Sequence, residues 1–451
     1  MAKILMRAGL SPLDNLDAGQ VIAKNMIKEN AGNMLFPYSI MRILMREDTQ
    51  ITIIEANRLY SAGQIAKWNE EYDYFVIPLA NAFRKSFRIQ LGFLTSLVKQ
   101  LKIPCILIGA GVQAGINGLS GARECDKDVK DFLNAILDKS AIAGIRGEYT
   151  AQYLKGLGFA EERDFTVIGC PSMYLHGPEL PQKPVEELTP KTRVSFNCKI
   201  KVPRKLGRFV FHSAKRFEQY TFIPQGIDDL RMLYAGESID REKFPKIFKQ
   251  YPCEPDSKIC ASGHELGFTD ARSWLEYLSG AGFSFGTRIH GNIAAVIAGT
   301  PAFIFAADGR ILELARYHNI PHMPADELTE ETDIFKVYEQ ADFAGVTRGH
   351  AKRFAHYASF LEKNGLSHIY MEGDAYGKSL FDEKMAELPV RGAIQPLYTL
   401  SEELQAQRLQ SYQALLSENV SGRLQKSKKL KSLAMKLPGS LRNTLIRIYK
   451  H

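Results

Sequence analysis

The stretch that most constrains the fold is residues 283–305, FSFGTRIHGNIAAVIAGTPAFIF. Two apolar runs of strand length enclose a tight turn and an alanine-rich run of helix length, so the pattern predicts strand, turn, helix and strand. Arg288 and His290 lie on the turn where that helix begins. A helix N-terminus offers unpaired N–H groups and the positive end of the helix dipole, and it therefore binds anions. A guanidinium and an imidazole at this point predict a site for a small, strongly anionic substrate.

Strand and helix signals alternate along most of the chain, which favours mostly parallel sheets covered by helices on both faces. The strands expected in the first part are residues 51–55, 74–78, 104–108, 141–145 and 165–168. The helices expected there are residues 18–46 with a break at 30–33, 87–101, 126–139 and 149–156. Later come strands at 193–198, 209–211 and 221–223 and a helix at 273–278. The sequence thus predicts an α/β fold with two Rossmann-like domains whose strand-end loops face one cleft.

Four prolines between residues 178 and 190 mark the boundary, because proline removes backbone donors and stiffens the chain. The predicted organisation is an N-terminal Rossmann-like domain (1–177), a proline-rich linker (178–190), a C-terminal Rossmann-like domain with the anion site (191–345), a helical extension (346–418) and a basic amphipathic tail (419–451).

The net charge of +8 arises from the basic residues of the C-terminal tail. Residues 419–451 contain nine Lys and Arg and no Asp or Glu, so the other 418 residues carry a net charge of −1. This distribution removes any case from composition for nucleic-acid binding by the globular body. Leucines alternate with the basic residues of the tail, which predicts an amphipathic helix on an anionic membrane surface; a solvated tail is the alternative.

The cysteines and the apolar runs indicate the compartment. Six cysteines are scattered without a CxxC pair, which is typical of reduced thiols in a cytoplasmic protein. In residues 1–7 a charged residue comes before any apolar segment, so this stretch does not resemble a signal peptide. The longest apolar block, residues 293–307, is interrupted and too short to span a membrane. We expect a cytoplasmic protein, peripheral at the inner membrane face if the tail binds there.

Further candidate substrate-binding residues lie at strand ends and helix starts. Gly111 and Gln113 follow the strand at 104–108 in a loop that lacks the spacing of a dinucleotide fingerprint. Arg146 precedes a helix start and either binds a ligand or pairs with Glu148 or another carboxylate. Asn33 contacts substrate or caps a helix.

Two more candidates belong to the C-terminal domain. Gly291 lets a ligand approach the backbone closely, or serves only the turn. Asp308 follows an apolar strand and either orients a sugar hydroxyl or pairs with Arg310.

No metal site is predicted. Asp126 and Asp128 form a DxD pattern, but at the start of a helical run, where a solvated helix turn is expected. His318 and His322 are separated by a proline, and no histidine or cysteine group has zinc spacing. Cys170 is expected to be a buried apolar residue and not a nucleophile.

Several short motifs follow one another in a fixed order within residues 24–365. They are NAGN at 30–33 with Phe36, LIGAGVQ at 107–113, GIRGE at 144–148 with Thr150, GCPS at 169–172, and RIHG at 288–291 with GTP at 299–301. In this order they resemble the polysaccharide pyruvyl transferase family. Family members often carry a histidine soon after the glutamine that corresponds to Gln113. This chain departs from that pattern, because Ala114, Gly115 and Ile116 follow the glutamine.

The resemblance implies a two-domain, glycosyltransferase-B-like architecture and a transfer of pyruvate from phosphoenolpyruvate to a pair of sugar hydroxyls, as a ketal, with loss of phosphate. It implies no cofactor and no metal, and an acceptor that is a sugar or a lipid-linked oligosaccharide of cell-surface or exopolysaccharide synthesis. Arg288 and Arg146 then hold the two anionic groups of the donor through bidentate contacts. His290 either protonates the enol carbon or stabilises the departing phosphate.

Two other functions stay open on the sequence. A nucleotide-sugar glycosyltransferase shares the architecture and places a diphosphate on the same helix start. A non-catalytic polysaccharide-assembly protein keeps the fold without turnover, and the altered loop after Gln113 is its best support.

Overall fold

The computed structural model describes the backbone of residues 1–119, 121–373 and 376–434, and side chains as far as residue 419. The strands of these ranges are β1 (Ala2–Arg7), β2 (Thr49–Ile54), β3 (Tyr74–Pro78), β4 (Cys105–Ile108), β5 (Ala143–Ile145), β6 (Phe165–Val167), β7 (Val194–Asn197), β8 (Tyr220–Phe222), β9 (Phe283–Gly286), β10 (Ala302–Ala306) and β11 (His322–Pro324).

The α-helices are α1 (Ala18–Ala23), α2 (Leu35–Leu44), α3 (Ala62–Glu71), α4 (Arg88–Gln100), α5 (Asp126–Leu137), α6 (Glu148–Gly156), α7 (Arg204–Ala214), α8 (Ile227–Ala235), α9 (Lys258–Ala261), α10 (Ala271–Ser279), α11 (Ile289–Ile297), α12 (Gly309–Tyr317), α13 (Ile334–Gln340), α14 (His350–Lys363), α15 (Leu380–Ala386) and α16 (Glu402–Ala434). Short 3₁₀ turns are η1 (Ala31–Met34), η2 (Lys85–Phe87), η3 (Pro171–Tyr174), η4 (Arg241–Lys243), η5 (Ala325–Glu327), η6 (Phe343–Val346) and η7 (Leu397–Thr399).

The first parallel sheet has the strand order β2-β1-β3-β4, and a bridge between Ala110 and Ile145 joins it to the parallel pair β5-β6. Alternate side chains of its strands enter two different apolar clusters: Ile4 and Met6 pack with α1 and α2, whereas Leu5 packs with α3, α4 and α5. Because a strand turns successive side chains to opposite faces, helices cover the sheet on both sides.

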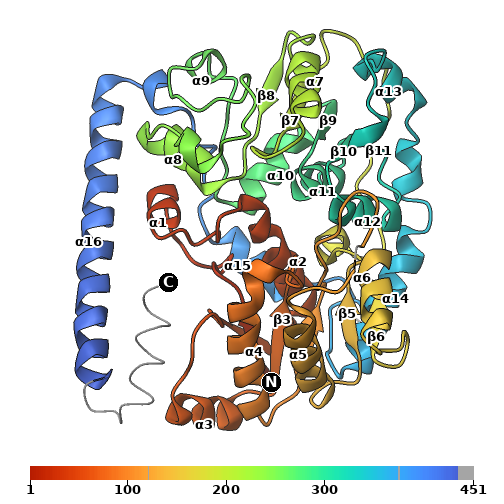
Figure 1. Ribbon diagram of the computed structural model, residues 1–451, viewed down its shortest axis with the longest axis vertical. Helices are drawn as coiled ribbons and strands as arrows, with labels where there is room; N and C mark the ends of the chain where they lie inside the picture. The colour runs from red at the N-terminus through yellow and green to blue at the C-terminus, as the bar shows by residue number, and fades with distance from the viewer. Residues whose placement is uncertain (120, 374–375, 435–451) are drawn as a thin grey trace.

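The second sheet is also parallel, with the order β11-β10-β9-β7-β8. In both sheets the second strand lies outside the first and the third lies on its other side, so each sheet has a switch point between its first and third strands. This topology confirms the predicted α/β fold of two Rossmann-like units that face each other, the glycosyltransferase-B-like arrangement (Figure 1).

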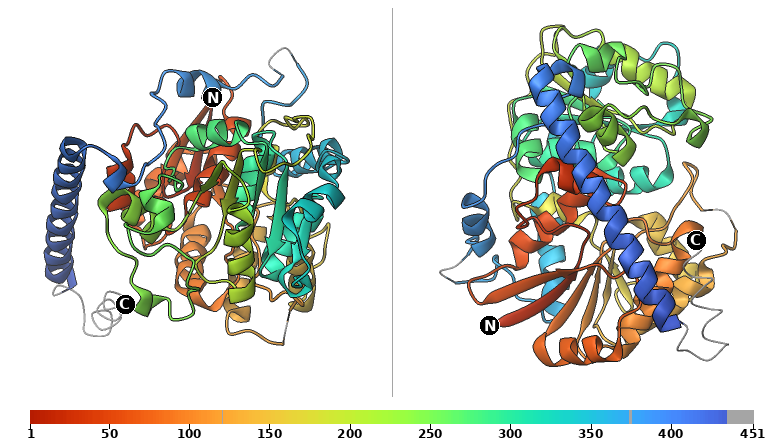
Figure 2. Two further views of the ribbon diagram at one scale, coloured as in Figure 1. Left: turned by 90° about the horizontal axis from the view of Figure 1, so that it is seen from above. Right: turned by 90° about the vertical axis from the view of Figure 1, so that its left-hand side faces the viewer.

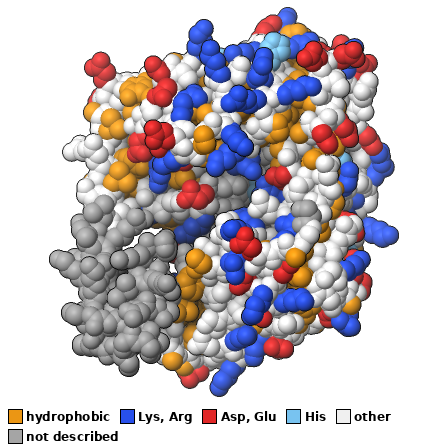
Figure 3. Space-filling view, viewed as in Figure 1, with side chains coloured by type: hydrophobic (Ala, Val, Ile, Leu, Met, Phe, Trp, Pro, Cys, Tyr) orange, Lys and Arg blue, Asp and Glu red, His pale blue; other side chains and the backbone are white. Residues whose placement is uncertain are grey.

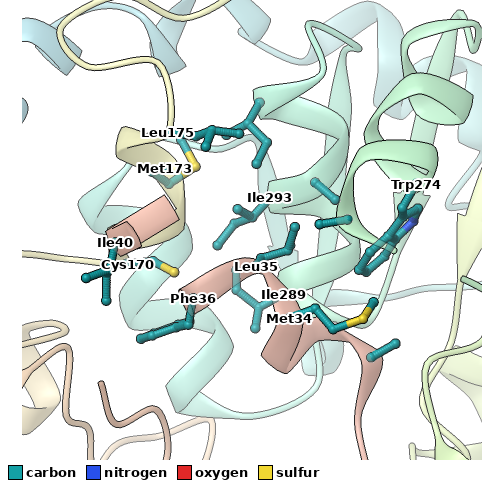
Figure 4. Close-up of a cluster of buried hydrophobic side chains, with 14 of the residues drawn as sticks. Met34, Leu35, Phe36, Ile40, Cys170, Met173, Leu175, Trp274, Ile289 and Ile293 are labelled. Atoms are coloured by element: carbon teal, nitrogen blue, oxygen red, sulfur yellow. The ribbon is translucent and has the colours of Figure 1, made fainter. Parts of the chain in front are cut away.

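The two units share one apolar core. Met34, Leu35 and Phe36, which precede and begin α2, pack against Ile289 and Ile293 of α11 in the second unit (Figure 4). Residues of the η3 segment, including Met173, close the same cluster. Burial of this many large side chains across the interface holds the facing strand ends at a fixed separation.

The C-terminal part of the chain ties the units together. α14 returns to the first unit, where Tyr357 stacks on Tyr174 with ring centroids 4.8 Å apart. α16 runs along both units (Figure 2). On it, Tyr412 meets Tyr234 of α8 edge-on at 5.6 Å, and the Asn419 amide donates to the Ala23 carbonyl of α1 at 3.2 Å.

One strand prediction is wrong. Residues 209–211 lie inside α7, because Leu206, Val210 and Ala214 recur at helical spacing around them, and a three-residue apolar run does not distinguish strand from helix. β1 and β11 were not predicted. In the described ranges no helix is both long and apolar enough to cross a bilayer. The predicted membrane-binding tail lies mostly outside the residues whose side chains are described.

Candidate functional site

A cavity of about 530 Å³ lies between the carboxyl ends of the two sheets, at both switch points. From the first unit it is lined by the residues that follow β1, β2 and β3; from the second, by residues that follow β7 and β9 and by the start of α12. In open parallel sheets this crevice is the usual place for a ligand.

The cavity is strongly cationic. Its lining contains seven cationic and two acidic side chains: Arg7, Lys28, Arg84, Arg146, Lys199, Arg288 and Arg310 against Glu29 and Glu55. Lys28 pairs with Glu55, so the excess positive charge is concentrated on the arginines and Lys199. Such a field favours a ligand with more than one negative group.

The turn between β9 and α11 places Arg288 at the N-cap of α11. The side-chain oxygen of Asn197, which ends β7, accepts a hydrogen bond from the Arg288 backbone N–H at 2.7 Å. The Asn292 amide donates to the Arg288 carbonyl at 2.9 Å, so both sides of the turn are fixed. Arg288 is half-buried, and its Nε has no hydrogen-bond partner in the described part of the chain.

His290 lies in the first turn of α11 and is 6 % exposed. Phe36 meets its ring edge-on at 5.6 Å. A Cβ on Gly32 would lie 2.6 Å from the His290 Cβ, so only glycine allows the first unit to approach so closely. Burial and the charges of Arg146, Arg310 and Arg288 lower the pKa of His290 to about 3. The imidazole is therefore neutral at pH 7 in the unliganded site.

Arg146 follows β5 and is 2 % exposed. Its Nη2 donates to the Gly109 carbonyl at 3.5 Å, and its buried Nε has no partner among the described residues. A Cβ on Gly111 would lie 2.1 Å from the Arg146 Cδ, so this glycine makes the room that the arginine occupies. Burial lowers the pKa of Arg146 to about 10, with Glu313 acting in the opposite direction, and the guanidinium stays charged at pH 7.

Arg310 enters from the first turn of α12. Asp308 caps that helix by accepting from the Ile311 N–H at 3.1 Å, and it pairs with Arg310 at 3.2 Å and with Lys199 at 3.9 Å. One side of the Asn81 amide, from the first unit, faces only donors, and with its oxygen assigned to that side it accepts from Arg310 at 3.1 Å and from Arg84 at 2.7 Å. Arg310 therefore links the two units at the cavity wall.

Four of the predicted site residues line the cavity: Asn33, Arg146, Arg288 and His290. The Asn33 amide donates to the backbone carbonyls of Ile27 and Lys28 at 2.9 and 3.1 Å, and Asn30, not Asn33, caps the turn. Arg146 forms no ion pair with Glu148, whose carboxylate accepts from Gln152.

The other four predicted residues lie behind or beside the cavity. Gly111 holds space for Arg146, and Gly291 is buried where a Cβ would lie 2.4 Å from the Gln225 amide nitrogen. Gln113 is exposed, and Asp308 acts as a helix cap with ion pairs, as the pairing alternative predicted.

The sequence did not single out Arg7, Arg84, Lys199 and Gln225. Arg7 ends β1 and Lys199 comes two residues after β7, so both follow the rule that site residues lie at the carboxyl ends of strands. Gln225 has both amide atoms buried with no partner in the described part of the chain, which leaves them for a ligand.

The residues excluded as metal ligands have other roles. Nε2 of His318 accepts from the Cys170 N–H at 2.8 Å, and burial raises the pKa of the Cys170 thiol. Asp126 and Asp128 begin α5 on the surface of the first unit, and Asp128 pairs with Arg88. No group of three or more histidine, cysteine or acidic side chains in the described ranges could hold a metal ion.

A family model described as polysaccharide pyruvyl transferase matches residues 30–309, which is more than half of the chain. No curated protein sequence matches significantly.

Solved structures with similar folds include HepE from Anabaena in complex with UDP, at 12 % identity and a TM-score of 0.40, covering 81 % of this chain and 98 % of that one. UDP-GlcNAc 2-epimerase from Methanocaldococcus jannaschii has 12 % identity and a TM-score of 0.38, covering 80 % and 99 %. A functionally uncharacterised protein from Klebsiella pneumoniae has 11 % identity and a TM-score of 0.38, covering 71 % and 93 %.

Proposed function

The chain belongs to the polysaccharide pyruvyl transferase family, as its motifs predicted, and from this membership we propose that it moves pyruvate from phosphoenolpyruvate onto two hydroxyls of a sugar. The product is a pyruvate ketal, and inorganic phosphate leaves. The observation that carries the proposal is the set of three arginines, one buried and two half-buried, near His290 at the start of α11, each with a buried Nε that has no partner in the described part of the chain.

Phosphoenolpyruvate carries a phosphate and a carboxylate, so it needs at least two cationic partners held apart from each other. Arg288 and Arg310 come from the second unit and Arg146 from the first, and the charge of all three acts on His290. Guanidinium groups match both anions through paired N–H donors. In our proposal these arginines and the backbone N–H groups of the first turn of α11 bind the donor.

His290 is proposed to act on the donor. In the unliganded site it is neutral, because burial and, after it, the three arginines oppose its protonation. The negative charge of bound phosphoenolpyruvate offsets those arginines and raises the pKa of His290 again. The imidazole then either delivers a proton to the enol carbon or donates a hydrogen bond to the departing phosphate.

The proton balance of the transfer needs no external acid or base. One hydroxyl proton of the acceptor ends on the former enol carbon, which becomes a methyl group, and the second leaves with the phosphate. Two C–O bonds to the acceptor replace the C–O bond to phosphate and the C=C double bond. The sugar is proposed to lie in the half of the cavity formed by the first unit, near Asn57, Phe87 and Gln90.

Ligand stabilisation tests the donor site. A ligand of the native state raises the melting temperature, by an amount that corresponds to about 2.7 kcal/mol at a hundredfold excess over Kd. We expect phosphoenolpyruvate to stabilise the protein and UDP- or GDP-sugars not to do so. Stabilisation by a nucleotide sugar alone would favour the glycosyltransferase function instead.

Product analysis tests the reaction. Candidate sugar acceptors are incubated with the protein and phosphoenolpyruvate, and the products are examined by mass spectrometry. We expect one ketal-linked pyruvate per acceptor and an equal amount of inorganic phosphate. Donor stabilisation without product over a broad acceptor panel would support the non-catalytic alternative.

A further inference from the structure

A stripe of exposed cations runs along α7 and continues on both sides of it. Residues 199–216 contain seven Lys and Arg and no Asp or Glu. Arg204, Arg208, His212 and Lys215 recur at helical spacing and are all exposed. Among the described residues, neither Arg204 nor Arg208 nor Lys215 has an ion-pair partner, whereas Arg216, at the end of the same segment, is paired with Asp333.

A second basic segment packs beside the first. Residues 241–249 read REKFPKIFK, with Arg241, Lys243, Lys246 and Lys249 exposed. Phe248 is buried against α7, where a Cβ on Gly207 would lie 2.5 Å from its ring. The Lys201 ammonium lies 5.1 Å from the centre of the Phe244 ring. Lys205 is exposed as well but donates to the Leu328 carbonyl, and Arg216 is paired. We call the other exposed Lys and Arg of the two segments the basic band: Lys201, Arg204, Arg208, Lys215, Arg241, Lys243, Lys246 and Lys249.

The basic band begins two residues after Lys199, which lines the cavity. Lys and Arg side chains gather over the upper part of the molecule, where α7 lies (Figure 3). Residues 1–418 carry a net charge of only −1. The eight cations of the basic band therefore concentrate positive charge locally, and Glu242 is the one acid between residues 241 and 249. Unpaired like charges repel one another, and an anionic partner would offset that repulsion.

We propose that the basic band docks on an anionic membrane surface and places the mouth of the cavity near the lipid headgroups. Phe244 and Ile247 stand between the lysines and are only partly buried on the core of the second unit. Lysines interspersed with an aromatic and an aliphatic side chain fit a headgroup layer, where the apolar groups enter the acyl boundary and the ammonium groups meet the phosphates. A nucleic acid is disfavoured because the band presents no exposed aromatic ring for base stacking in the described residues.

The test uses the intact chain and co-sedimentation with vesicles. We expect binding to vesicles of phosphatidylcholine mixed with phosphatidylglycerol, little binding to pure phosphatidylcholine, and loss of binding as salt is raised. The triple variant Arg204→Gln, Arg208→Gln, Lys215→Gln should bind the mixed vesicles about a hundredfold more weakly, since each basic residue near the surface contributes about a fivefold factor.

A matched control neutralises three exposed cations elsewhere that have no ion-pair partner among the described side chains, with Lys99→Gln, Lys102→Gln and Lys352→Gln. This control should bind the mixed vesicles like the unaltered protein, and both triple variants should keep the stabilisation by phosphoenolpyruvate. Equal binding by the two triple variants would overturn the proposal and assign membrane binding to the tail. Weakened binding of RNA with unchanged vesicle binding would overturn it in favour of a nucleic-acid surface.

Discussion

The carboxylate of Glu313 on α12 accepts a hydrogen bond from the backbone N–H of Thr150 on α6, at 3.1 Å, and so joins the two units beside the cavity. The Thr150 hydroxyl also bonds to this carboxylate, at 3.2 Å. A Cβ on Gly147 would lie 2.9 Å from Glu313 Oε2, so a larger residue at the position after Arg146 would displace this carboxylate. Burial raises the pKa of Glu313 to about 7, with Arg146, the Thr150 hydrogen bonds and Arg310 acting in the opposite direction.

We predict that binding of an anion at Arg146 and Arg310 drives proton uptake by Glu313. An anion beside these arginines disfavours the carboxylate and raises its pKa further, so at pH 7 the site takes up as much as about half a proton. Calorimetric titration with phosphoenolpyruvate in buffers of different ionisation enthalpy measures this uptake. Glu313→Gln should lower the uptake by the share that this carboxylate contributes, while protons that belong to His290 or to the ligand itself contribute equally in both proteins.

The control for this titration is Glu148→Gln, which changes an exposed carboxylate on α6 that accepts a hydrogen bond from Gln152. It should show the proton uptake of the unaltered protein. Identical uptake in Glu313→Gln would mean that the carboxylate does not respond to the ligand.

A second prediction concerns the space that Gly111 gives to Arg146. In Gly111→Ala the new methyl would lie 2.1 Å from the Arg146 Cδ, so the guanidinium must leave its position. We expect donor affinity, measured by ligand-induced stabilisation, to fall at least about tenfold. Gly92→Ala in α4 is the matched control, because its Cβ meets nothing within 4 Å, and it should leave donor affinity unchanged. Equal donor affinity in the two variants would exclude Arg146 as a donor ligand.

The part of the site that one local segment encodes could be predicted from the sequence. Arg288 and His290 lie between a strand and a helix whose apolar patterns are clear, and the helix start follows directly. Arg7 was missed because the strand that carries it was not predicted. The strand that it ends, AKILMR, has an apolar run of only three residues between Lys3 and Arg7, and without β1 there is no strand end from which to place the arginine.

Contacts between the units could not be predicted, because no local pattern encodes them. Gly32 reads as a turn glycine, yet its role is to let η1 approach His290. Gly111 reads as a loop residue that faces a cleft, and it lies instead behind Arg146. Arg310 was assigned only a pairing role, since nothing near it in the chain reveals Asn81 across the cavity. The domain boundaries and the roles of the site residues stay predictions.

The third prediction distinguishes the role of the Arg288 charge from that of the His290 imidazole at the start of α11. Arg288→Ala should lower transfer about a hundredfold or more and weaken stabilisation by phosphoenolpyruvate, since it removes a cation from the donor site. His290→Ala should lower transfer comparably, but with a smaller loss of donor stabilisation, because the imidazole is neutral before the donor binds. The melting temperature without ligand should stay near that of Arg316→Ala, a control on the exposed side of α12. Near-normal activity in either variant would refute the assignment.

The fourth prediction concerns Glu265, which is fully buried and has both carboxylate oxygens without a hydrogen-bond partner in the described part of the chain. Burial, together with the charge of Asp229, raises the pKa of Glu265 well above its ordinary value, so the folded protein keeps this carboxyl protonated. In the unfolded chain it ionises near its ordinary pKa of 4.5. The unfolded state therefore releases a proton that the folded state retains, and stability falls as the pH rises above that value, by about 1.4 kcal/mol per pH unit.

Glu265→Gln keeps the shape and stays neutral at every pH, so it removes this penalty. The variant should melt close to the unaltered protein at pH 5 and at a clearly higher temperature at pH 8. The exposed carboxylate of Glu276 on α10 serves as the control, and Glu276→Gln should not change the pH dependence of melting. The neutral state of Glu265 requires burial without a partner, because a carboxylate with a cation or donor beside it would stay ionised. In that case the glutamine variant would be less stable than the unaltered protein at pH 8.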